Sequence, residues 1–206
     1  MPHFLIKKEE IKYNFIELKD ENTFFHLVKV LRVKPNEKIK FIDENQNVYY
    51  STIKEINKKT LLAEINKKEK SERFLKTNLC LIQAVLMSDA QNLLIANATQ
   101  SGIKEIYPII SDNIAPKASS LENKQEKWQK IAFENFKQCE RADIPKIQEL
   151  SNLKEAISKF KKENVLIFAE KYENSNLNNC LFSCDFKEKI AIVVGPEGGF
   201  SEKEFN

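Results

Sequence analysis

The sequence predicts an α/β protein of two domains, a small β domain followed by a larger domain built on a parallel sheet. The first 70 residues contain short apolar segments separated by polar, Asn-rich turns, which is typical of a small barrel or curled sheet. Beyond Thr77, wholly apolar segments alternate with segments of helical spacing, which indicates strands that are buried on both faces by helices. We place the domains at residues 1–70 and 75–206.

The first domain is predicted to contain five strands and one helix. The strands are predicted over residues 4–6, 13–18, 38–43, 48–56 and 61–65. Apolar residues at positions 24, 27, 28 and 31 have helical spacing, with Asn22 or Thr23 as the N-cap. The highly charged residues 66–77 are predicted to be a linker.

The second domain is predicted to alternate strands and helices. Strands are predicted over residues 79–86, 103–110, 165–169 and 190–194, and helices over residues 89–101, 124–141 and 153–161. Gly102 follows the first of these helices directly, where glycine commonly ends a helix. The long helix has an apolar stripe, formed by Trp128, Ile131, Ala132, Phe136 and Cys139.

Charge is divided unevenly along the 206 residues. Residues 1–76 hold 17 Lys and Arg against 12 Asp and Glu, whereas residues 77–206 hold 16 against 18. A basic first domain favours a polyanion as partner, such as a nucleic acid. The alternative is that the many lysines are ordinary surface residues.

Several functional classes are disfavoured by composition. Two histidines, His3 and His26, leave little material for a zinc site or a Ser-His-Asp triad, and we predict no metal. The four cysteines form no C-x-x-C pair, which favours reduced thiols in a cytosolic protein. No apolar run reaches the roughly 20 residues of a membrane helix, and the N-terminus does not read as a signal peptide. We therefore expect a cytoplasmic protein without a membrane partner.

The chain has only four glycines, and three of them lie in one loop. The apolar segment 190–194 runs directly into Gly195-Pro196-Glu197-Gly198-Gly199, so the loop follows the carboxyl end of a buried strand, where open α/β sheets bind ligands. Glycine lets the backbone approach a ligand closely. Neither the P-loop nor the dinucleotide fingerprint fits, and the loop suits an uncharged or cationic group better than a triphosphate. The alternative is a tight turn that binds nothing.

A capping box follows the glycine loop. Ser201 and Glu204 have the spacing that begins a helix at about residue 202. The sequence stops at Asn206, about one turn later, and an isolated turn is not stable alone. We therefore expect the biological chain to continue further.

Glu134, Gln138 and Arg141 are spaced i, i+4 and i+7 on the predicted long helix and so share one face. Arginine is the preferred residue for bidentate phosphate contacts, and glutamine can read a base edge. The alternative is a solvated flank that holds an ion pair.

These motifs together resemble one family. His26-Leu27-Val28-Lys29-Val30-Leu31-Arg32 is similar to an "H-x-x-x-V-L-R" segment, Trp128 through Arg141 to a "W-x-x-I-x-x-E-A-x-x-Q-x-x-R" helix, and residues 192–200 to an "I-G-P-E-G-G" motif. All three are found in the RsmE family, which methylates N3 of a uridine in 16S ribosomal RNA. Departures include Ser111-Asp112-Asn113 in place of Ser-Glu-Arg, and Asn135 in place of the helix alanine.

The resemblance implies a knotted SPOUT-type catalytic domain preceded by a PUA-like RNA-binding barrel, and a homodimer acting on the small ribosomal subunit. It implies S-adenosylmethionine as cofactor, with a knot-closing segment beyond Asn206. The cofactor residues implied are Ala169, Gly195, Pro196, Glu197, Gly198 and Gly199.

Our hypothesis also assigns roles at the substrate. We expect Arg141 to hold a phosphate or to stabilise the uracil anion, with Gln138 orienting the base and Glu134 bracing Arg141. His26, Arg32 and Lys34 are expected to contact the RNA. Two competing hypotheses are ribose 2′-O methylation by another SPOUT enzyme and RNA binding without catalysis.

Overall fold

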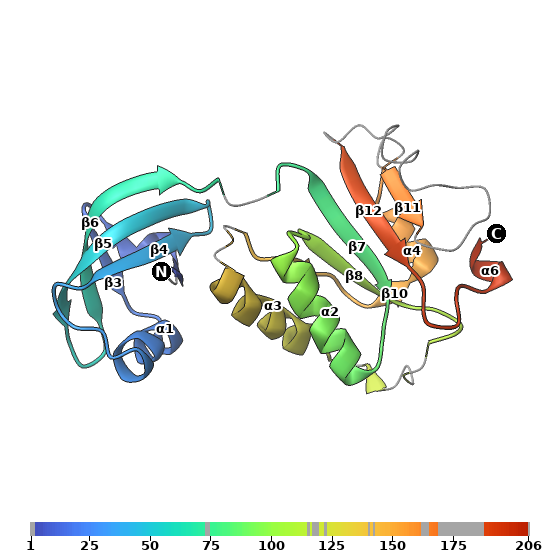
Figure 1. Cartoon of the computed structure of the whole chain (residues 1–206), viewed down its shortest axis with the longest axis horizontal. Coiled ribbons are helices and arrows are strands. Elements are labelled where there is room, and N and C mark those ends of the chain that lie inside the picture. The colour runs from blue at the N-terminus through green and yellow to red at the C-terminus, as the bar shows by residue number, and fades with distance from the viewer. Residues whose placement is uncertain are drawn as a thin grey trace. The chain divides into compact units, whose positions relative to one another are not determined.

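The computed structural model describes residues 3–72, 75–114, 116, 120–121, 123–139, 141, 143–161, 165–168 and 188–205. The chain divides into two units (Figure 1). One comprises Met1–Phe74 with Lys137–Asp143, and the other comprises Leu75–Phe136 with Ile144–Asn206. No described helix is both long enough and apolar enough to cross a membrane.

The first unit is built on a six-stranded sheet in the order β1-β4-β5-β6-β3-β2. β1 runs parallel to β4, and the other neighbouring strands are antiparallel. Its elements are β1 (His3–Ile6), η1 (Lys8–Glu10), β2 (Ile11–Lys12), β3 (Phe15–Leu18), α1 (Glu21–Phe25), η2 (His26–Val30), β4 (Lys38–Asp43), β5 (Asn47–Ile56) and β6 (Leu61–Lys70). The predicted strands are all present.

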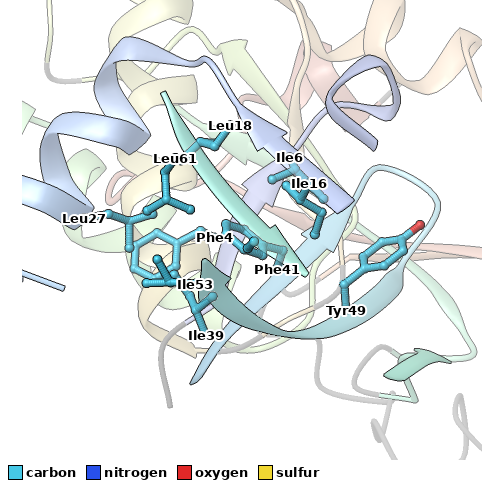
Figure 2. Close-up of a cluster of buried hydrophobic side chains, with 11 residues drawn as sticks. Phe4, Ile6, Ile16, Leu18, Leu27, Ile39, Phe41, Tyr49, Ile53 and Leu61 are labelled. Atoms are coloured by element: carbon cyan, nitrogen blue, oxygen red, sulfur yellow. The ribbon is translucent and has the colours of Figure 1, made fainter. Parts of the chain in front are cut away.

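Alternate residues of these strands build the core of the first unit. Ile39 and Phe41 of β4 and Tyr49 and Ile53 of β5 are buried, as period-two patterning requires. Figure 2 shows them converging with apolar side chains from β1, β3, β6 and η2, where Leu27 is fully buried. The apolar pattern of the short strands therefore supplies one continuous core.

Two predicted boundaries in the first unit are wrong. The helix is capped by Asp20 rather than by Asn22 or Thr23, because the Asp20 carboxylate accepts a hydrogen bond from the Thr23 N–H at 2.8 Å. β6 continues to Lys70, through residues predicted to be a linker. Its backbone pairs with β5 from Lys67 to Lys70, and such pairing needs no apolar side chains on an exposed part of a strand.

A buried carboxylate closes the turn between β4 and β5. Asp43 is 3% exposed and accepts hydrogen bonds from the N–H groups of Asn45 and Asn47, from Asn47 Nδ2 and from Tyr49 Oη, all at 2.8–2.9 Å. Burial opposes ionisation, but these four donors outweigh it and lower the pKa of Asp43. Burial and the nearby carboxylate raise the pKa of Tyr49 to about 12.

The second unit contains an entirely parallel sheet in the order β10-β8-β7-β12-β11, with β9 also paired to β8. This confirms the predicted parallel α/β architecture. The described elements are β7 (Asn78–Ala84), α2 (Ser88–Gln100), β8 (Glu105–Ile110), α3 (Gln125–Cys139), β9 (Lys146–Ile147), β10 (Ser151–Asn152), α4 (Leu153–Ser158), β11 (Val165–Phe168), β12 (Lys189–Val194) and α6 (Glu202–Phe205). The two-residue strands β9 and β10 were not predicted.

Helices cover both faces of this sheet (Figure 1). Trp128 and Ala132 of α3 pack with Ile95 of α2 in one buried cluster, and Leu153 of α4 packs with Ile82 of β7 in another. α2 ends at Gln100 with Ser101 as its C-cap, and Gly102 follows with a φ of 95°, in the place predicted for it. The wholly apolar strands are therefore explained by burial on both sides.

Candidate active site

The parallel strands bring three loops to one edge of the second unit's sheet. Residues 85–87 follow β7, residues 111–114 follow β8 and residues 195–201 follow β12. β7 lies between β8 and β12 in the sheet. The glycine loop therefore lies at the carboxyl edge, where ligands bind in open α/β sheets.

The glycine loop is a tight turn in which two glycines meet different requirements. The Gly199 N–H donates to the Pro196 carbonyl at 2.9 Å, and Gly199 has a φ of 72°, in the left-handed region. Gly198 instead lacks room for a side chain, because an added Cβ would lie 3.2 Å from the Cβ of Asn113. Glycine is therefore favoured at Gly199 by its backbone conformation and at Gly198 by the close approach of Asn113.

Asn113 ties the glycine loop to the loop that follows β8. Its Nδ2 donates to the carbonyl of Gly199 at 3.0 Å. Its neighbour Asp112 accepts a hydrogen bond from Ser201 Oγ at 2.6 Å. We call these two bonds, together with those of Glu204 described next, the loop strap.

Glu204 of α6 completes the loop strap. Its Oε2 accepts hydrogen bonds from Ser111 Oγ at 3.0 Å and from the Ser201 N–H at 2.9 Å, and its Oε1 accepts one from the Asp112 N–H at 3.4 Å. The helix predicted from residue 202 is present. Only one of the two hydrogen bonds of the predicted capping box forms, the one from the Ser201 N–H to the Glu204 carboxylate. The Ser201 hydroxyl instead donates to Asp112, in the loop that follows β8.

Two aromatic rings connect the glycine loop to the end of β11. Phe200 is buried, and its ring meets that of Phe168 edge-on at a centroid distance of 6.3 Å. Ala169, the predicted cofactor residue that follows Phe168, lies outside the described residues. Its role stays a prediction.

A cavity of about 570 Å³ opens beside the loop strap. Asp112, Phe168, Lys154, Lys203 and Glu204 are among the residues that line it, from the ends of β8 and β11 and from α4 and α6. It offers charged groups of both signs next to an aromatic ring. These residues were not predicted, because their neighbourhood depends on the strand order.

A second cavity of about 430 Å³ lies between α2 and α3, lined by Leu86, Gln91, Lys127 and Trp128 among others. The Gln91 Oε1 accepts a hydrogen bond from the Leu86 N–H at 3.0 Å, which fixes the orientation of the amide. Among the described residues, nothing accepts a hydrogen bond from its buried Nε2.

The predicted substrate residues lie at the end of α3. Glu134 and Gln138 are on the helix, but α3 ends at Cys139, so Arg141 does not continue their face as predicted. The Nε and Nη2 of Arg141 donate to Asp143 Oδ1 at 3.1 and 2.9 Å. This ion pair therefore lies beyond the end of α3.

Glu134 is grouped with the second unit, whereas Gln138 and Arg141 are grouped with the first. Arg141 is 6% exposed, which the sequence did not indicate. The joining of these side chains with the glycine loop in one site stays a prediction, as does the bracing of Arg141 by Glu134.

The predicted RNA-binding residues follow one another around the end of η2. His26 begins η2 and its ring lies 5.9 Å from that of Phe4, while Arg32 and Lys34 are exposed just beyond the helix. Arg32 has a φ of 55°, and the next N–H, that of Val33, returns to the Leu27 carbonyl at 3.1 Å. Arg32 thus occupies the left-handed position that glycine usually takes at a helix end.

Comparison with solved structures supports this fold. The chain superposes on the ribosomal RNA small subunit methyltransferase E from Neisseria gonorrhoeae bound to S-adenosyl methionine, with a TM-score of 0.84 and 25% identity, over 100% of this chain and 83% of that one. A probable rRNA-methyltransferase from Porphyromonas gingivalis has the same fold, with a TM-score of 0.81 and 18% identity over 100% of this chain and 84% of that one.

Sequence comparisons agree with the structural ones. A family model for an RNA methyltransferase domain matches residues 72–206, and one for an RNA methyltransferase PUA domain matches residues 18–66. A ribosomal RNA small subunit methyltransferase E from Mesomycoplasma hyopneumoniae is 29% identical over 92% of this chain and 83% of the relative. One from Borreliella burgdorferi is 30% identical over 87% of this chain and 74% of the relative. The chain therefore belongs to the ribosomal RNA small subunit methyltransferase E family of RNA methyltransferases.

Proposed function

We propose that the protein transfers a methyl group from S-adenosylmethionine to N3 of a uridine in 16S ribosomal RNA of the small ribosomal subunit. The observation that carries this proposal is the glycine loop, held at the carboxyl edge of a parallel sheet by the loop strap. Its sequence is the motif that resembles the family, and the relatives of the chain are named as ribosomal RNA methyltransferases.

The residues of the loop fit a cofactor of this kind. Gly198 lets the loop pack closely on Asn113 and Gly199 permits its tight turn, while Phe168 and Phe200 supply an apolar wall. Gly195, Pro196, Glu197, Gly198, Gly199 and Ala169 would hold S-adenosylmethionine, which when bound supplies a methyl group on a sulfonium. The task of the protein is then to align the two reactants, since orientation alone removes much of the barrier to a displacement.

The substrate side requires stabilisation of an anion, because uracil N3 carries a proton until it reacts. Arg141 is suited to this, since its ion pair with Asp143 fixes the plane of the guanidinium. Arg141 is 6% exposed, and we propose that it holds a phosphate or stabilises the uracil anion. Gln138 then orients the base and Glu134 braces the arginine.

We further propose a PUA-like barrel over residues 1–70 and a knotted SPOUT domain over residues 75–206, in a cytoplasmic homodimer. Met87, which precedes α2, and Leu93, which lies within it, are 59% and 62% exposed, which fits a helix covered by a second copy. His26, Arg32 and Lys34 are proposed to contact the RNA.

Nucleoside analysis tests the reaction. Small ribosomal subunits that lack the modification are incubated with the protein as its gene encodes it and with methyl-labelled S-adenosylmethionine, and the RNA is then digested and separated. N3-methyluridine is the expected product. A 2′-O-methyl nucleoside would instead identify the competing SPOUT reaction, and no labelled nucleoside would favour RNA binding without catalysis. An Arg141→Ala variant that retains full turnover would remove Arg141 from the mechanism.

A further inference from the structure

The outer face of the sheet in the first unit carries a tyrosine between two lysines. The strand register places Lys40 of β4, Tyr50 of β5 and Lys67 of β6 side by side, and we call these three residues the Tyr50 row. Tyr49 and Ser51 are buried, so Tyr50 points away from the core, and it is 36% exposed. An aromatic ring is therefore presented on an open sheet face.

The ring of Tyr50 is held in place and surrounded by positive charge. Its hydroxyl donates to Glu69 Oε1 at 2.6 Å. The Nζ atoms of Lys40 and Lys67 lie 5.5 and 5.6 Å from the ring centroid, within the range of cation–π contacts. Lys67 also forms an ion pair with Glu69. The orientation of the ring is thus fixed before any partner arrives.

The next row across the same face extends the surface. Lys38, Thr52, Glu64 and Phe15 are paired across four strands, and Phe15 is 37% exposed. Lys54 lies two residues beyond Thr52 on β5 and pairs with Glu64 at 2.7 Å. These two rows and the partners named above therefore combine two exposed aromatic rings with four lysines and two glutamates, which gives them a net positive charge.

We infer that this face binds single-stranded RNA, with an unpaired base stacked on Tyr50 and the flanking phosphates contacted by Lys40 and Lys67. This inference rests on the proposed RNA substrate and concerns a surface different from that of His26, Arg32 and Lys34. Aromatic rings beside basic side chains on a sheet are a general means of holding unpaired bases. Inside a duplex, both faces of a base are covered by its stacked neighbours.

Lys40 and Lys67 do not prevent a base from stacking on the ring of Tyr50. An exposed cation–π contact is weaker than the stacking of a base on an aromatic side chain. An arriving base therefore displaces an ammonium group, and the flexible lysine remains close enough to reach a phosphate next to that base. The same side chains thus serve the free protein and the complex.

Fluorescence anisotropy tests the inference, with a labelled 20-nucleotide single-stranded RNA of mixed sequence and the whole chain. Tyr50→Ala is expected to weaken binding on the order of tenfold, because stacking on one ring is lost. Tyr50→Phe retains the ring and is expected to bind within about twofold of wild type, since stacking does not need the hydroxyl. Wild-type affinity in Tyr50→Ala, or equal losses in the two variants, would overturn the inference.

The lysines are tested by salt dependence. The double variant Lys40→Ala/Lys67→Ala is expected to lower the slope of log affinity against log salt by about 1.4, since each phosphate contact on a single strand contributes about 0.7. Lys58→Ala/Lys59→Ala removes the same charge at the turn between β5 and β6 and serves as the matched control. Equal changes of slope in the two double variants would contradict a specific role for the Tyr50 row.

A duplex RNA of the same length separates stacking from charge alone. It is expected to bind more weakly than the single strand to wild type and to be insensitive to Tyr50→Ala. Equal sensitivity of both RNAs would overturn the stacking. These measurements need no cofactor or turnover, so they can fail while methyl transfer to ribosomal subunits persists, or succeed when methyl transfer is absent.

Discussion

Replacement of Gly198 by alanine measures how tightly the glycine loop is packed. The added Cβ would lie 3.2 Å from the Cβ of Asn113, whereas carbon atoms prefer about 3.5–4.0 Å, so one of the two loops must move by about 0.3–0.8 Å. That movement strains the 3.0 Å hydrogen bond from Asn113 to Gly199. Overpacking costs about 1–3 kcal/mol and a lost hydrogen bond about 1 kcal/mol, so we expect a loss of about 2 kcal/mol.

Thermal unfolding followed by circular dichroism measures this loss. For a chain of this size about 2 kcal/mol corresponds to a fall of about 4–8 °C in the unfolding midpoint. Asn113→Gly removes the opposing Cβ, so the double variant Gly198→Ala/Asn113→Gly is expected to be about 1–2 kcal/mol more stable than the sum of the single changes predicts. An unchanged midpoint in Gly198→Ala, or effects that add within about 0.5 kcal/mol, would refute the steric explanation.

Three further changes test other features. Asp43→Ala is expected to cost about 3 kcal/mol in urea unfolding, because it leaves buried donors without an acceptor. Because the pKa of Asp43 is lowered in the folded protein, its carboxylate stabilises the fold above the ordinary pKa of about 4. This stabilisation is lost as the pH falls through the lower folded pKa. If the difference in free energy of unfolding between wild type and Asp43→Ala grew as the pH fell, the explanation would be contradicted. Arg32→Gly is expected to raise stability by up to about 1 kcal/mol while weakening binding to RNA, whereas a less stable variant would show that the backbone at this position is not strained. Glu204→Gln is expected to lower the melting temperature of the second unit by a few degrees, since Ser111 Oγ and the Ser201 N–H lose a charged acceptor; a midpoint equal to that of wild type would exclude a stabilising role for the loop strap.

The sequence was most informative where local patterns determine structure. Apolar runs predicted β7, β8, β11 and β12 to within two residues, and Gly102 marked the end of α2. The ends of other elements depend on contacts with no simple pattern. The long helix ends at Cys139, before the predicted residue 141, and pairing with β5 extends β6 into a charged segment.

The candidate site divides in the same way. The glycine loop could be located from composition, because three of four glycines lie within five residues that follow an apolar strand. Its partners could not be predicted, because they are distant in sequence. Asn113 contacts Gly199, which is 86 residues away, and Glu204 contacts Ser111, which is 93 residues away. Only the strand order, with β7 between β8 and β12, makes these two loops neighbours.

That strand order also has a consequence for the time at which the site forms. β12 is the last described strand in sequence, yet it lies between β7 and β11, more than 100 residues after the first of them. Pairings across such long separations require closure of large loops and form slowly. During synthesis the ribosome releases the amino-terminal segments first. The glycine loop can therefore take its final shape only after most of the second unit has been translated, so cofactor binding would report that the sheet is fully assembled.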